Sequence, residues 1–337
     1  MPRQQLPVTL AGRAFTIASA RQLGLGEGRL RGQDLSRPFH GVRVDTASPP
    51  ARDHRGALQT DARAASLVLP ADCAFSHCTA ATLLGLPLPR SHEHPRLHVM
   101  RPTSRNPVAR PQMHAHLGLE SRETVRVEGL RVVSAADTWV DLASLLGVED
   151  LVVLGDSVAR RAGSVDPLRA AVTRRGRVRG VRALREALDW IRVGSDSPME
   201  TRSRLLFVRH GLPEPELNVT VMARDGSGFL CRSDFVWRHQ RVIGEYQGEH
   251  HFGSYERGDD DIARRLLAED DGWKYVEITR SDVFHPARRH GLVQRLARYL
   301  GVEVVADRPI PTWQGRFATT SGRCAAESTP LSAGRRR

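Results

Sequence analysis

The chain has 337 residues, of which 40% are hydrophobic and 26% are charged, so it is long enough for two or three domains with substantial cores. No apolar run reaches the length that spans a bilayer, and the N-terminal stretch lacks the apolar core of a secretory signal, which together predict a cytoplasmic protein. Four cysteines at this length exclude the small disulfide-stapled class and predict reduced thiols.

The balance of charge is strongly basic. A formal net charge of +12 favours a polyanionic partner such as nucleic acid, because basic side chains neutralise phosphates. Nearly all of the basic residues are arginine, and Lys274 is the single lysine. A bias in coding composition would give the same excess, so charge alone leaves both explanations open.

Residues 13–45 predict a helix, a turn, a second helix and a strand. The apolar positions from Phe15 onward end at Gly24, a signal for a helix C-terminus, and the second helix is expected from Glu27 to Ser36. Residues 42–44 then form a wing strand, which completes the outline of a winged helix. Four arginines would contact DNA there, mostly at phosphates, although a solvated helix face explains them equally: Arg21, Arg29, Arg31 and Arg43.

The stretch CAFSHC offers Cys73, His77 and Cys78 as zinc ligands, but no second knuckle follows to complete a structural site. We therefore expect Ser76 to cap a short helix, CTAATLLG, and His77 to be a buried hydrogen-bonding residue. Three further histidines lie nearby in an expected loop and strand: His92, His94 and His98.

A strand from Leu130 to Val133 is expected next, with helices starting after Ser134 and at Val148. Ser134 and Asp137 match a capping box, which makes Asp137 a structural acid. Arginines then crowd between Thr173 and Arg185, in an expected loop that enters the helix VRALREALDW. This loop is either a phosphate-contacting linker or a solvated surface, and the arginines assigned to DNA are Arg174, Arg175, Arg177 and Arg179.

A helix is expected to start at Ser197, because Ser197 and Glu200 match a capping box and Pro198 takes the first helical position. Capping alone explains Glu200, and an active-site acid in this helix explains it as well. The strands LNVTVMA and FLCRSDFVW follow.

The next stretch predicts a hairpin of two short strands, Asp234 to Trp237 and Arg241 to Tyr246, separated by a polar turn. It carries two carboxylates, on Asp234 and Glu245. Burying acids among apolar residues is unfavourable unless a cation compensates them, so their convergence predicts a divalent metal site. Mg²⁺ suits it, since this ion takes one or two carboxylates and leaves its other positions to water and phosphate oxygens.

At these residues the chain resembles the PD-(D/E)XK nuclease superfamily, and more closely its very-short-patch-repair-like branch. The family pattern is a helical Glu, an Asp on a strand, and then Glu-x-Asp-Gly followed by His. It corresponds here to Glu200, Asp234, the run from Glu245 to Gly248, and His251. The likeness spans roughly residues 195–303 and continues through Asp261-x-x-Arg264, Gly272-Trp273 and the strand KYVEIT.

The resemblance implies a Mg²⁺- or Mn²⁺-dependent DNA endonuclease. Asp234, Glu245 and the carbonyl of Tyr246 would hold the ion, Gln247 and His251 would position water, and Arg264 would balance charge. Gln247 departs from the pattern, because relatives carry Lys or Asp there and Gln cannot act as a general base. The alternative is a non-catalytic DNA-binding regulator with a degenerate nuclease fold.

The N-terminal half resembles AbiEi-type antitoxins, through the order of its first elements, the runs SHCTAA and LGLP, and the segment SAADTWVDLAS. This resemblance implies DNA binding and admits a cognate toxin as partner. We therefore expect an α/β chain, α+β overall, with a restriction-endonuclease-like mixed sheet near its C-terminus. Its parts are a winged-helix-like module (1–50), an AbiEi-like region (51–190), a nuclease-like domain (195–305) and a disordered basic tail (306–337).

Overall fold

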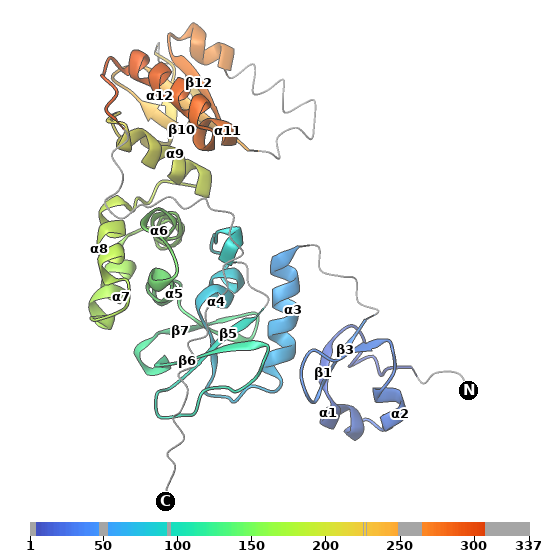
Figure 1. Ribbon diagram of the computed structural model, residues 1–337. Coiled ribbons are helices and arrows are strands. Elements are labelled where there is room, and N and C mark those ends of the chain that lie inside the picture. The colour runs from blue at the N-terminus through green and yellow to red at the C-terminus, as the bar shows by residue number, and fades with distance from the viewer. Residues whose placement is uncertain are drawn as a thin grey trace, which may run out of the picture.

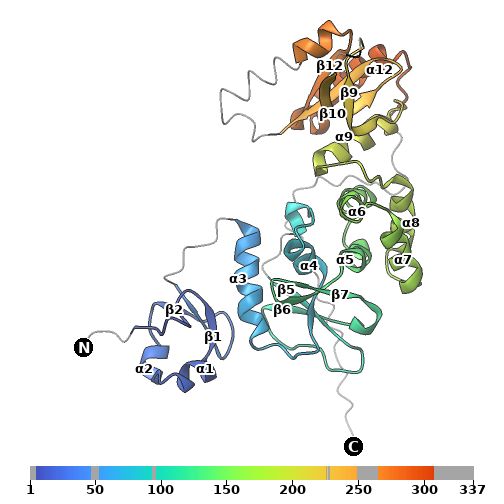
Figure 2. The same ribbon diagram turned by 180° about the vertical axis from the view of Figure 1, so that it is seen from behind.

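The computed structural model describes residues 5–46, 53–92, 96–224, 226, 228–248 and 265–306. Within these ranges the chain is α+β, as predicted, and it forms three separate sheets with helices packed beside them. Figure 1 shows three bodies that follow one another along the chain, coloured dark blue, lighter blue to yellow-green, and yellow to orange-red. Figure 2 gives the same arrangement from behind. None of the helices in the described ranges combines the length and apolar character needed to cross a membrane.

The first body is a small sheet with two short helices. Its three strands pair antiparallel in the order β1-β3-β2, around a core that includes Phe15 and Leu30. The elements are β1 Ala14–Thr16, α1 Ile17–Gln22, α2 Glu27–Leu30, β2 Leu35–Ser36 and β3 Val42–Asp45.

The strand at residues 42–44 and the helix end before Gly24 agree with the prediction, but both helices were predicted too long. Phe15 lies on a strand, and the second helix ends at Leu30. Gly28 and Gly32 are poor helix formers, and the residues after them turn back to join the sheet.

The second body contains a five-stranded mixed sheet in the order β6-β5-β4-β8-β7. Strands β5 and β6 run parallel, and helices α3 and α4 contact the sheet (Figures 1 and 2). The predicted strand β8 has the expected bounds. The elements are α3 His54–Ser66, β4 Ala74–Phe75, α4 His77–Leu83, β5 Leu97–Arg101, β6 Met113–Leu117, β7 Thr124–Val127 and β8 Leu130–Val133.

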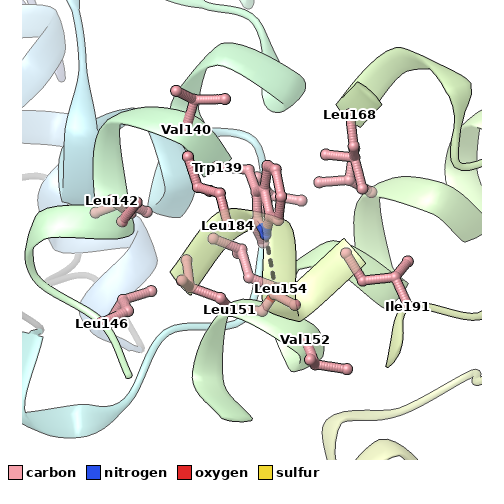
Figure 3. Close-up of a cluster of buried hydrophobic side chains, with 14 of the residues drawn as sticks. Trp139, Val140, Leu142, Leu146, Leu151, Val152, Leu154, Leu168, Leu184 and Ile191 are labelled. Carbon is pink, nitrogen blue, oxygen red and sulfur yellow. Dashed lines mark hydrogen bonds between the residues drawn. The ribbon is translucent and has the colours of Figure 1, made fainter. Parts of the chain in front are cut away.

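Four helices complete this body, α5 Ala135–Asp141, α6 Val148–Ala162, α7 Asp166–Arg175 and α8 Val181–Trp190. Their shared core surrounds Trp139, which is fully buried and donates from Nε1 to the carbonyl of Leu151 over 2.8 Å (Figure 3). Ser134 caps α5 as predicted. The start of the arginine-rich stretch was predicted as loop, whereas it forms the last turn of α7, which ends at Gly176 with φ 60°.

The third body is a four-stranded sheet in the order β12-β11-β10-β9, in which only the β11–β12 pair is parallel. Helices α9 and α12 cover one face, and residues 265–270, which are helical, pack on the other through Ala268. The hairpin, the start of α9 and strand β12 agree with the prediction. The elements are α9 Pro198–Arg209, β9 Glu216–Met222, β10 Phe229–Trp237, β11 Val242–Gln247, β12 Lys274–Thr279, α11 Arg280–Phe284 and α12 Pro286–Leu300.

Candidate functional site

The three predicted acids come from three neighbouring elements of the third body. Glu200 lies in the first turn of α9, Asp234 on β10 and Glu245 on β11. The β10–β11 pairing runs from Trp237 opposite Val242 to Phe235 opposite Gly244, so the two strand acids follow directly after the last paired positions. The backbone N–H of Tyr246 there donates to the Asp234 carboxylate over 2.8 Å. The hairpin therefore brings both strand acids to one end of the pair.

Neutral donors contact all three carboxylates. The Ser233 hydroxyl donates to Glu245 over 2.8 Å, and the Asn218 amide donates to Glu200 over 2.5 Å. Glu200 also accepts from the backbone N–H of Asp196 over 2.8 Å. Ser197 accepts from the Glu200 N–H, so only half of the predicted capping box forms, and the Glu200 side chain is directed to the residue before the cap.

Asn218 has a strained backbone beside the acids. Its φ is 51°, in the left-handed region that non-glycine residues rarely adopt within a strand. Its neighbours Leu217 and Val219 pair with Phe235 and Ser233, which places Asn218 opposite Asp234. Together with the hydrogen bond to Glu200, this position links the helical acid to the strand acid. The sequence offered no signal for Asn218, because the irregularity depends on how β9 and β10 pair.

The three acids interact electrostatically. The pKa of Asp234 is raised from 3.8 to about 7, first by burial and then by the charges of Glu200 and Glu245. The Tyr246 N–H and Arg232 oppose the rise without cancelling it. A bound cation stabilises the charged form of a carboxylate whose pKa is raised by neighbouring acids.

The donor set fits a hard divalent ion. Carboxylate and carbonyl oxygens are the ligands of Mg²⁺ and Mn²⁺, and the half-buried Glu245, Tyr246 and Gln247 end strand β11. Gln247 lies two positions after Glu245 on the same strand, which directs both side chains to one face of the sheet. Two further residues that the resemblance assigns to the site, His251 and Arg264, lie outside the described residues.

The N-terminal arginines assigned to DNA fall into two groups. Arg21 and Arg31 are exposed, with side-chain accessibilities of 57% and 73%, and both pair with Glu27. Arg29 is 6% exposed and pairs with Asp34. Arg43 donates to the carbonyls of Leu30 and Val42. The second group therefore holds the module together through internal contacts.

The arginines around α7 divide in the same way. Arg174 and Arg175 bind the buried acids Asp137 and Asp141, and Arg175 is only 6% exposed. Arg177 and Arg179 are exposed beyond the helix end. Sequence patterns could not separate these two pairs of arginines, because all four belong to one basic run.

A histidine cluster in the second body was not predicted as a group. His77, His98 and His116 each offer one ring nitrogen, and these atoms all lie within 4.8 Å of one another. The expected hydrogen bond of His77 exists, from or to the Ser76 hydroxyl at 3.1 Å, but Ser76 does not cap α4 through its side chain. Cys78 packs in the hydrophobic core and is not part of this cluster. The one available signal was the alternation in MHAHL, which directs His114 and His116 to the same face.

The comparisons place the chain among known sequences. An uncharacterized protein of Mycobacterium tuberculosis strain H37Rv, Rv2248, is 32% identical over 208 residues, which cover 60% of this chain and 73% of that protein. The chain belongs to its family. A protein of M. tuberculosis strain CDC 1551, MT2308, matches with the same identity and coverage, and it too is named only as uncharacterized. No protein-family model matches the chain. No solved structure matches it either.

Proposed function

We propose that this chain is a metal-dependent DNA endonuclease of the PD-(D/E)XK type, which hydrolyses phosphodiester bonds in the cytoplasm. The observation that carries the proposal is the convergence of Glu200, Asp234 and Glu245, from a helix and two strands, on one end of a hairpin. The order of elements supports it, since one helix precedes three antiparallel strands and a helical segment leads to a parallel fourth strand.

Asp234, Glu245 and the Tyr246 carbonyl would hold Mg²⁺ or Mn²⁺. Bound there, the ion polarises the scissile phosphate and lowers the pKa of the attacking water. Glu200 holds Asn218 and the start of α9 in place, and thereby orients the strand that carries Asp234. The Gln247 amide orients water by hydrogen bonding, since it has no titratable group.

The remaining residues come from the family pattern. As the water oxygen bonds to phosphorus and the bond to the leaving sugar oxygen breaks, a proton of the water passes to His251. Arg264 balances the charge that develops on the phosphate. DNA would be held by the exposed arginines Arg21, Arg31, Arg177 and Arg179, each of which replaces counterions on the phosphates.

A second candidate is a non-catalytic, antitoxin-like DNA-binding regulator with a toxin as partner. Gln247 favours it, because the position that carries Lys or Asp in relatives has neither a charge nor a proton acceptor. The small sheet of the first body, with a wing strand from Val42 to Asp45, supports DNA binding in either case.

The test is nicking of supercoiled plasmid by the full chain with Mg²⁺ or Mn²⁺, and with EDTA as the metal-free arm. Asp234→Asn and Glu245→Gln should each lower the rate at least ~10²-fold. Glu216→Gln is the matched control, since this exposed acid of the same sheet pairs with Arg238 instead. Equal nicking by all variants would assign the activity to another protein. DNA binding without nicking by the wild type would favour the regulator.

A further inference from the structure

The histidine cluster gathers side chains from three separate segments of the second body. His77 is the first residue of α4, His98 lies on β5, and His116 lies on β6. The His77 and His116 rings stack with their centroids 3.8 Å apart, and the ring centroids of His98 and His116 are 5.2 Å apart. Helix α4 runs beside these strands in both views (Figures 1 and 2).

Ring nitrogens of two members already face each other. Nδ1 of His98 lies 3.0 Å from Nε2 of His116. Two nitrogens on one tetrahedral zinc ion are separated by roughly 3.4 Å, given zinc–nitrogen bonds of about 2.0–2.1 Å. The three donors, all within 4.8 Å of one another, therefore lie close to the separation that one ion requires.

The surroundings of the cluster suit ligation. A metal-bound histidine usually fixes its other nitrogen with a hydrogen bond, and Nδ1 of His77 has such a partner in the Ser76 hydroxyl at 3.1 Å. The His77 and His116 side chains are half-buried. The nearby charges of Arg122 and Arg175 are paired with Asp141.

His77 itself is held in an unfavourable conformation. Its φ is 49°, a left-handed backbone for a non-glycine residue at the start of a helix. Such strain persists where the surrounding structure imposes it, and it concentrates at sites of function. Here it sets the imidazole against the sheet, in contact with the ring of His116.

We propose that His77, His98 and His116 bind one transition-metal ion, with zinc as the first candidate. Imidazole is a ligand for zinc, copper, iron and nickel, whereas Mg²⁺ and Ca²⁺ prefer oxygen, so this site and the acids of the third body would take different ions. Three protein ligands leave a fourth position on zinc for water or an anion. Because β6 is an edge strand, the ion would also fasten that edge to α4.

The experiment uses the full chain without a polyhistidine tag, stripped of metal and then titrated with Zn²⁺. One equivalent should bind and raise the melting temperature, because a ligand of the folded state stabilises it. His77→Asn, His98→Asn and His116→Asn should each weaken that binding more than ~10²-fold, since a lost ligand is at least as harmful as a lost supporting contact. His92→Asn is the control, a half-buried histidine outside the cluster, and should bind like the wild type.

X-ray absorption at the zinc edge of the wild type tests the same site without any variant. Three imidazole nitrogens at about 2.0–2.1 Å are expected. Sulfur ligands, at about 2.3 Å, would assign the ion to cysteines and overturn the proposal. Absence of binding by the wild type, or an equivalent retained by any of the three variants, would overturn it as well.

Discussion

Two regions of the molecule bury carboxylates in opposite ways. In the second body, Asp137 contacts Arg174 at 2.6 Å and Asp141 contacts Arg175 at 2.8 Å. In the third body, Asp234 accepts from a backbone N–H, and its pKa is raised by burial and by two neighbouring acids. Aspartate is thus paired with arginine in the second body, whereas in the third body it lies beside two other acids. An acid paired with arginine has a structural explanation, whereas acids that lie together are stabilised by a bound cation.

The largest change in stability is expected where a buried acid loses the arginine that pairs with it. Arg204 is fully buried and contacts Asp156 at 3.1 Å and Glu214 at 3.0 Å. Arg204→Met should lower the free energy of unfolding by about 3–5 kcal/mol, because it leaves a buried carboxylate without a counter-charge. Urea denaturation measures the loss.

The control for that loss is Arg238→Met, since Arg238 and its partner Glu216 are each 45% exposed. A loss below about 1 kcal/mol is expected for such a surface pair. Equal losses for the two variants would show that burial of the pair has no part in its strength.

Removing one of the three neighbouring acids should instead raise the free energy of unfolding of the metal-free protein. Below the unfolded pKa of 3.8, Asp234 is protonated in both the folded and the unfolded chain. Between that value and about 7 the unfolded chain ionises while the folded one keeps its proton, so the wild type loses stability as pH rises, and the full loss is reached above pH 7.

Asp234→Asn should therefore stabilise the metal-free protein by about 2 kcal/mol at pH 8, allowing for screening of a half-buried group. The difference from the wild type should vanish near pH 4. Melting curves in EDTA across this range provide the measurement. A destabilised variant at pH 8 would mean that Asp234 is compensated like the acids of the second body.

The smallest effect is expected on DNA binding, at the exposed arginines that follow α7. Replacing Arg177 and Arg179 with Gln should weaken DNA binding and reduce the slope of log affinity against log salt by about 2, since each lost phosphate contact contributes about 0.9. Arg63→Gln is the control, an arginine paired with Glu128. Fluorescence anisotropy at several salt concentrations gives the slopes, and an unchanged slope would make these arginines a solvated surface.

Local patterns predicted the elements that carry the acids. The hairpin follows from two apolar strands and one polar turn, and the start of α9 follows from Ser197 and Pro198. Strand β12 matches the run KYVEIT from end to end. These features depend on residues that are close in sequence, which is why they can be predicted from the sequence.

Contacts between distant segments could not be predicted. His98 and His116 meet because β5 and β6 pair in parallel, and His77 joins them from α4. Arg175 meets Asp137 across the interface of α7 with α5. The spacing of residues in the sequence does not determine which distant segments pair. The histidine cluster was therefore missed, and all arginines of the basic run were assigned the same role.

If Glu200, Asp234 and Glu245 together hold a divalent cation, calorimetry should detect Mg²⁺ binding to the full chain. Mg²⁺ avoids the histidine cluster, because imidazole suits it poorly. Titrations at pH 6 in two buffers of different ionisation enthalpy report the protons released with each ion. We expect binding with release of about one proton, since Asp234 must ionise to ligate and its pKa is about 7. Asp234→Asn should abolish both the Mg²⁺ binding and the proton release. Absence of binding, or binding that Asp234→Asn leaves unchanged, would contradict the proposal that these acids hold the ion.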